Sequence, residues 1–172
     1  MASVACHETR GTASADKRQC ETATHSSICG MGQRGVDEAV ERTAARTGPE
    51  LDLSNMDLSD GDLSLVLASV PDWTANFSAL TTLELGRNQL GTVPDWIGNL
   101  TALTKLDLGR NQLGAVPDSI GNLTSLTTLD LSENHLPTVP DSIRNLTSLT
   151  TLNLRNNRLI GRDILRFCQF AG

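Results

Sequence analysis

The stretch Lys105-Leu-Asp-Leu-Gly-Arg-Asn-Gln-Leu113 decides the fold, because related stretches recur along the chain every 23 residues. The related stretches are Thr82-Leu-Glu-Leu-Gly-Arg-Asn-Gln-Leu90, Thr128-Leu-Asp-Leu-Ser-Glu-Asn-His-Leu136 and Thr151-Leu-Asn-Leu-Arg-Asn-Asn-Arg-Leu159. A second stretch, Val-Pro-Asp-x-Ile-x-Asn-Leu-Thr, lies between them with the same interval and starts at Val93, Val116 and Val139. An interval that stays constant over successive units indicates a repeat architecture.

Each unit begins with the alternation that is typical of a short, half-buried strand. Leu83 and Leu85 flank Glu84, so the two leucines point to one side of the strand and the glutamate to the other. Because no single unit can bury its own leucines, successive strands are expected to stack in parallel. The residue that ends each strand then forms a column of buried amides, which bond the backbone of their own and the adjoining unit. The members of this column are Asn88, Asn111, Asn134 and Asn157.

The rest of each unit continues the apolar wall around the other side of the stack. Its apolar positions in the second unit are Leu90, Val93, Ile97, Leu100 and Leu103. Pro94 followed by Asp95 suits the first turn of a short helical segment. We therefore expect a sheet on one side of each unit and a short helical turn on the other.

The combined pattern LxxLxLxxNxLxxVPxxIxxLxxL resembles the leucine-rich repeat family in its 23-residue form, over about residues 49–160. This resemblance implies an α/β fold, a short curved horseshoe-shaped solenoid. The parallel β-sheet would form the concave face, and short helical or 3-10 segments would form the convex face. The chain is similar in particular to intracellular Ras-related leucine-rich-repeat scaffolds, whose 23-residue repeats bind small GTPases and phosphatases.

The residues on either side of the repeats predict the domain organisation. The chain has 26 leucines, but none precedes Leu51, and Ser, Thr, Gly and charged residues dominate the first segment. We expect a disordered tail at 1–35, a capping helix at 36–48, the repeat domain at 49–160, and a small C-terminal cap or a truncated end at 161–172. In the irregular first unit, Met56 takes the asparagine slot, and extra residues at about 59–67 predict a full convex helix.

Charge and hydropathy exclude several classes of function. The net charge is −6, and residues 49–160 hold thirteen acids against six bases, which argues against nucleic acid and anionic membranes as partners. The longest nearly apolar stretch, 63–70, is too short to span a bilayer. The first thirty residues lack the apolar run of a signal peptide, so a cytoplasmic location is expected. We also expect the chain to be a monomer.

No catalytic, cofactor or metal site is expected. The sequence lacks GxSxG, HExxH and a phosphate-binding glycine loop. His135 occupies a slot where other units have Gln89, Gln112 and Arg158, so it is interpreted as part of a solvated turn. The scattered cysteines and histidines before residue 30 lack the paired spacing of structural zinc ligands. We therefore expect no enzyme activity.

What remains as a candidate site is the outer face of the sheet. In the leucine-rich repeat family this face usually binds a protein ligand, so the resemblance implies binding rather than chemistry. The predicted protein-binding residues are Asp52, Thr82, Glu84, Arg87, Lys105, Asp107, Arg110, Thr128, Asp130, Glu133, Asn153 and Arg155, with Glu50 and Thr151 beside them. The acids among them are expected to form a solvated row, interleaved with arginines. The alternative is that repeat duplication alone keeps these residues similar.

Two further features of the convex side are open to two interpretations. Trp73 and Trp96 are candidate anchors for a second contact, or they are partly buried against the neighbouring repeat. Four Asn-x-Ser/Thr sequons begin at Asn76, Asn99, Asn122 and Asn145. They are glycosylation acceptors in a secreted protein, or structural turns in which the threonine bonds nearby backbone. Their recurrence at the repeat interval and the lack of paired-cysteine caps favour the second interpretation.

The sequence leaves two hypotheses for function. The first is a non-catalytic protein-binding module, a scaffold or signalling adaptor with an unidentified protein partner. The second is a truncated sensor or regulatory part of a larger receptor or ligase. They differ in what lies beyond the last residue, Gly172.

Overall fold

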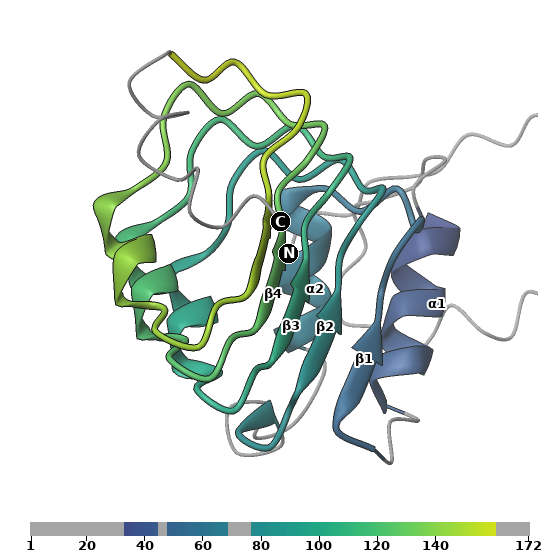
Figure 1. Cartoon of the computed structure of the whole chain (residues 1–172). Coiled ribbons are helices and arrows are strands. Elements are labelled where there is room, and N and C mark those ends of the chain that lie inside the picture. Colours follow the sequence, from purple (N-terminus) through teal and green to yellow (C-terminus); the bar gives the residue numbers. More distant parts are fainter. Residues whose placement is uncertain (1–32, 45–47, 69–76, 161–172) are drawn as a thin grey trace, which may run out of the picture.

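The computed structural model describes residues 33–44, 48–68 and 77–160. Five short strands form one parallel sheet in the order β1-β2-β3-β4-β5 (Figure 1). The strands are β1 (Glu50–Asp52), β2 (Thr82–Glu84), β3 (Lys105–Asp107), β4 (Thr128–Asp130) and β5 (Thr151–Asn153). Equivalent residues of successive units pair directly, so that Leu83 pairs with Leu51 and Leu106. The predicted leucine-rich repeat solenoid with a parallel sheet is confirmed.

A 3-10 turn follows each of the strands β2, β3 and β4 on the side away from the sheet (Figure 1). The turns are η1 (Asp95–Asn99), η2 (Asp118–Asn122) and η3 (Asp141–Asn145), and a proline in extended conformation precedes each of them. Stacking buries most leucines of the five units in one continuous core, as a solenoid requires. At the centre of the stack, Leu106 and Leu129 are fully buried.

The first unit carries a full helix, α2 (Asp60–Ala68), in place of a 3-10 turn. A capping box begins it, because Asp62 accepts hydrogen bonds from the backbone and hydroxyl of Ser59, at 2.9 and 2.6 Å. Asp60 joins the helix to the second unit by accepting hydrogen bonds from the backbone of Gly91 and Thr92, at 2.9 and 3.2 Å. The helix expected at about 59–67 is therefore present, shifted by one residue.

The helix before the repeats, α1 (Gln33–Ala44), lies beside β1 at the end of the sheet (Figure 1). It begins within the tail expected at 1–35, which corrects that boundary, and residues 45–47 at its expected end lie outside the described residues. Gly35 lets its first turn approach the first unit closely, because a Cβ there would clash with the carbonyl of Met56. The expected tail up to residue 32 and the segment 161–172 lie outside the described residues.

The asparagines form one column through the stack. Asn111 is 6% exposed, and its Oδ1 accepts a hydrogen bond from the backbone of Leu90 at 3.1 Å. Its Nδ2 donates hydrogen bonds to the carbonyls of Leu85 and Leu108, both at 3.0 Å. Leu85 and Leu90 belong to the preceding unit, so the side chain joins two units. Asn88, Asn134 and Asn157 make equivalent bonds, although Asn157 is only partly buried. Met56, in the asparagine slot of the first unit, is buried, and its backbone N–H donates to Asn88 Oδ1 at 3.1 Å.

A second column, which was not expected from the sequence, lies at the start of the strands. The hydroxyl of Thr104 donates to the carbonyl of Thr81 at 3.0 Å, and the hydroxyl of Thr127 donates to the carbonyl of Thr104 at 2.9 Å. Thr150 repeats the arrangement, and Thr81 does so with the carbonyl of Pro49. The threonines recur every 23 residues, so the repeat interval itself was the signal for this column.

Candidate functional site

The concave face consists of three rows of side chains that cross the five units. The leading row comprises Glu50, Thr82, Lys105, Thr128 and Thr151, and the acidic row comprises Asp52, Glu84, Asp107, Asp130 and Asn153. The turn row follows the strands and comprises Asn55, Arg87, Arg110, Glu133 and Asn156. The strand leucines between the first two rows are buried on the opposite side, so each unit presents polar side chains on one face only.

All five residues of the turn row have left-handed backbones, with φ between 53° and 57°. This conformation is costly for residues other than glycine. In the first four units it is held by hydrogen bonds to the next unit, for example from the backbone of Arg110 to the carbonyl of Ser132 at 2.8 Å. In the last unit Asn156 occupies this row. Arg155 is exposed at the preceding position, where earlier units have Gly86 and Gly109.

Most residues of the acidic row accept a hydrogen bond from the backbone two residues further on. Asp107 accepts from Gly109 at 2.8 Å and Asp130 accepts from Ser132 at 2.8 Å. These bonds fix each carboxylate over its own turn. In the last unit an amide replaces the acid, and Asn153 Nδ2 donates to Asp130 Oδ2 at 2.9 Å.

The bases of the face pair with only some of its acids. Lys105 Nζ lies 2.6 Å from Glu84 Oε1, and Arg110 Nη2 lies 3.1 Å from Glu133 Oε1. The hydrogen bond that Lys105 donates to Glu84 raises the pKa of Lys105. Among the described residues, neither Asp107 nor Asp130 forms an ion pair within 4.0 Å. The middle of the acidic row therefore keeps negative charge that no neighbouring cation contacts.

Within the acidic row, the pKa of Asp107 at the centre is raised, whereas the pKa of Asp52 in the first unit is lowered. Burial raises the pKa of Asp107, and the negative charges of Asp130 and Glu84 raise it further. The hydrogen bond from the backbone of Gly109 lowers this pKa but does not cancel the rise. For Asp52, burial raises the pKa, but the bonds from Ser54 and the charge of Arg42 outweigh burial, so that the pKa is lowered. The row is thus less solvated at its centre than expected from the sequence.

The substitution Asp107→Asn is expected to stabilise the protein at pH 7 by about 0.5 kcal/mol or less, a small value because the carboxylate is only partly buried. An amide keeps the bond from Gly109 and can donate to Asp130, as Asn153 does. An acid with a raised pKa in the folded state favours folding at low pH and loses this contribution as the pH rises through that pKa. The stability gained by Asp107→Asn should therefore vanish at pH values below the ordinary aspartate pKa of 3.8.

Chemical denaturation at pH 7 and pH 3 measures this difference. Asp118→Asn is the matched control, because it removes the same charge from an exposed convex position. Equal effects of the two substitutions at both pH values would contradict the electrostatic account of the acidic row.

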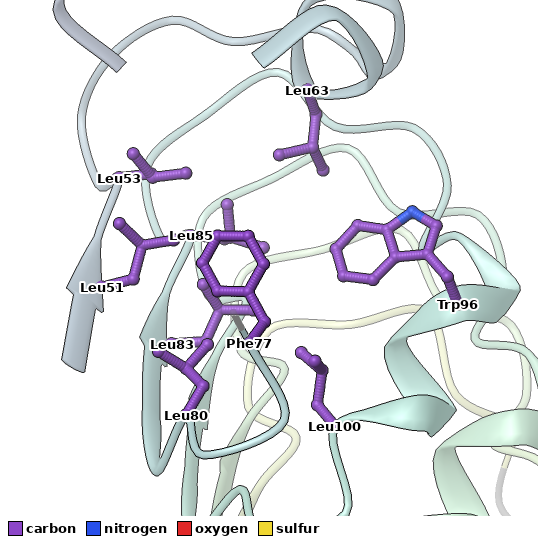
Figure 2. Close-up of a pocket in the computed structure, with 9 residues that line it drawn as sticks. All are labelled: Leu51, Leu53, Leu63, Phe77, Leu80, Leu83, Leu85, Trp96 and Leu100. Carbon is purple, nitrogen blue, oxygen red and sulfur yellow. The ribbon is translucent and has the colours of Figure 1, made fainter. Parts of the chain in front are cut away.

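The convex side does not offer Trp96 as a free anchor. Its indole is partly buried against the core and lines an apolar pocket together with Leu63 of α2, Phe77 and Leu100 (Figure 2). The strand leucines Leu51, Leu53, Leu83 and Leu85 and the neighbouring Leu80 line the rest of the pocket. The structure thus supports partial burial, the second of the two interpretations of Trp96. Trp73 lies outside the described residues.

Within 33–44, 48–68 and 77–160, no group of three or more His, Cys, Asp or Glu residues is placed to hold a metal ion. His135 is exposed, and its backbone N–H donates to the carbonyl of Leu113 at 3.0 Å. None of the helices in these ranges has the length and apolar character needed to cross a bilayer.

Comparisons with known proteins agree with this geometry. A family model described as "Leucine-rich repeat region" matches residues 53–165. The leucine-rich repeat protein LIC12759 of Leptospira interrogans is similar, with 32% identity and a TM-score of 0.54 over 59% of this chain and 26% of that chain. InlP of Listeria monocytogenes is 39% identical with a TM-score of 0.50, over 62% of this chain and 27% of that chain. A search of curated protein sequences gave no significant match.

The matched part of this chain thus spans about a quarter of the length of those two structures. The leucine-rich repeat fold commonly mediates protein–protein interaction. The constant repeat interval, the parallel sheet, the asparagine column and the match to the family model lead to one conclusion: this chain belongs to the leucine-rich repeat family.

Proposed function

We propose that this chain is a non-catalytic protein-binding module, a scaffold or signalling adaptor whose protein partner contacts the concave face. One observation carries the proposal: five strands present aligned polar side chains that are exposed or half-buried on one face of the sheet. The opposite face of the same strands is buried in the core. Exposed polar side chains on a rigid scaffold are well suited to recognition, because little ordering is needed when a partner binds.

The charges of the face suggest how a partner is selected. Lys105 and Arg110 already pair with acids of neighbouring units, whereas Asp107 and Asp130 have backbone and amide donors. A partner with basic side chains would therefore meet carboxylates that are free to pair with it, and complementary charge favours both specificity and rapid association. Five strands span about 20 Å, so we expect a modest affinity.

The second hypothesis, a regulatory part of a larger receptor or ligase, uses the same face. It is compatible with the finding that the two solved structures extend well beyond the matched region. The two hypotheses differ in the domains joined to the repeats and not in the residues that contact the partner.

Neutralising three acids of the face tests the proposal. The combined variant Glu84→Gln, Asp107→Asn and Asp130→Asn is expected to weaken partner capture from a lysate of the source organism at least tenfold, because three carboxylates lose their charge while side-chain shape is kept. Its thermal unfolding should remain close to that of the native chain, since surface substitutions usually cost under about 0.5 kcal/mol each.

The matched control removes the same charge from the convex side through Asp95→Asn, Asp118→Asn and Asp141→Asn, all at exposed positions. Captured proteins are quantified by mass spectrometry for the native chain and both variants. A protein that is retained by the control and lost from the concave variant is the expected partner. Identical capture by all three chains would show that the concave face is not the binding site.

A further inference from the structure

Three complete sequons lie where the 3-10 turns end. Asn99, Asn122 and Asn145 are the last residues of η1, η2 and η3. Each is followed by a buried leucine and then by Thr101, Thr124 or Thr147. The sequon that begins at Asn76 starts outside the described residues.

The backbone of these sequons forms a tight turn. Leu123 has φ −80° and ψ 58°, and Leu146 has φ −76° and ψ 73°, values close to those of an inverse γ-turn. The matching hydrogen bond is present in both, from Thr124 N–H to the carbonyl of Asn122 and from Thr147 N–H to that of Asn145, each at 2.9 Å. The turn points the leucine into the core and leaves the residues on either side of it at the surface.

The side chains of the three sequons are exposed and make no hydrogen bond within the described part of the chain. Thr124 thus differs from Thr104 and Thr127, whose hydroxyls donate to the backbone of the preceding unit. The expectation that the sequon threonine bonds nearby backbone is therefore wrong for these three units. A free amide and a free hydroxyl two residues apart are the groups that an N-glycosylation acceptor needs.

We propose that Asn99, Asn122 and Asn145 are acceptors for N-linked carbohydrate. In this modification, the Nδ2 of the asparagine attacks the anomeric carbon of a lipid-pyrophosphate-linked oligosaccharide. A nitrogen–carbon bond forms, the carbon–oxygen bond to the pyrophosphate breaks, and the lipid pyrophosphate leaves with the electron pair. The amide gives up one proton to a base of the transferase.

The placement of the acceptors fits a binding protein, although the proposal does not depend on that function. The 3-10 turns lie on the side away from the sheet, so carbohydrate on them leaves the concave face open (Figure 1). The modification requires that the chain enter the secretory pathway. The proposal is therefore incompatible with the cytoplasmic location that was expected from the sequence. The following experiment decides between a glycosylated and a cytoplasmic protein.

The chain isolated from its source organism is digested with a peptide N-glycosidase, and its mass and peptides are measured before and after digestion. We expect a mass above 18.4 kDa that falls on digestion, with conversion of Asn99, Asn122 and Asn145 to aspartate. An unmodified mass, or carbohydrate at Asn76 alone, would overturn the proposal. In a eukaryotic secretory host, Thr124→Val should lose the carbohydrate at Asn122, whereas Thr124→Ser should keep it.

A stability measurement separates the acceptor role from a structural one. In unmodified protein, Thr124→Val should leave the midpoint of thermal unfolding unchanged, because its hydroxyl has no partner to lose. Thr104→Val is the matched comparison and should lower the midpoint, because it removes the bond to Thr81. Equal losses in the two variants would show that the sequon threonine has a structural bond, and would overturn the geometry on which the proposal rests.

Discussion

Replacing Asn111 with alanine is expected to lower the free energy of unfolding by about 3 kcal/mol, because several buried backbone groups lose their partner together. The side chain accepts a hydrogen bond from Leu90 and donates to the carbonyls of Leu85, Leu108 and Gly109. It is 6% exposed, so water does not readily replace these bonds. Asn111→Asp should cost at least as much, because a carboxylate would face three carbonyl oxygens without a proton to donate.

Gln112→Ala is the matched control for this prediction. Gln112 is the next residue and is exposed, and its hydrogen bond to the carbonyl of Leu90 comes from the backbone, which the substitution keeps. Urea denaturation of both variants measures the difference. Equal losses for Asn111→Ala and Gln112→Ala would mean that the asparagine column does not hold the units together.

Gly121→Ala is expected to cost about 1–3 kcal/mol, because a methyl group does not fit between two stacked 3-10 turns. A Cβ at this position would lie 2.6 Å from the carbonyl oxygen and 2.8 Å from the Cβ of Ser142 in the next unit. These atoms are the backbone and the Cβ of Ser142, which cannot rotate away as the end of a flexible side chain can. The fourth unit has Arg144 in the equivalent slot, and no further 3-10 turn is stacked on it within the described residues.

Gly114→Ala provides the comparison within the same unit. A Cβ there meets no atom within 4 Å, and none of the described glycines has a positive φ. This substitution should leave stability unchanged or raise it by about 0.4–1 kcal/mol through a less flexible unfolded chain. A lower midpoint of thermal unfolding for Gly114→Ala than for Gly121→Ala would contradict the close stacking of the turns.

Much of the fold could be predicted from the repeat interval, because a constant 23 residues determines which residues are neighbours. Leu83 and Leu106 occupy the same position of successive units, so their strands must pair without offset. The short turn after Pro94 was expected from the same comparison between units. The interval carries no information outside the repeats, and for that reason the expected start of α1 was wrong.

The details of the concave face could not be predicted in the same way, because they depend on neighbours in three dimensions. Asp107 is partly buried because its carboxylate packs against Gly86 of one unit and Gly109 of its own, which leave room for it. Arg155 was grouped with the other residues of the concave face that follow the strands. Counting from Leu154 shows that Asn156 takes the slot of the turn row, and its left-handed backbone confirms the assignment.

The central claim, that a protein partner contacts the concave face, is tested most directly by site-specific photo-crosslinking. A benzophenone side chain is placed at Thr128 on the concave face or, as a control, at the exposed Asp118 on the convex side. Both full-length chains are irradiated in an extract of the source organism. The account predicts a discrete crosslinked protein from position 128 that is absent from position 118. The same adduct from both positions, or an adduct from position 118 alone, would contradict it.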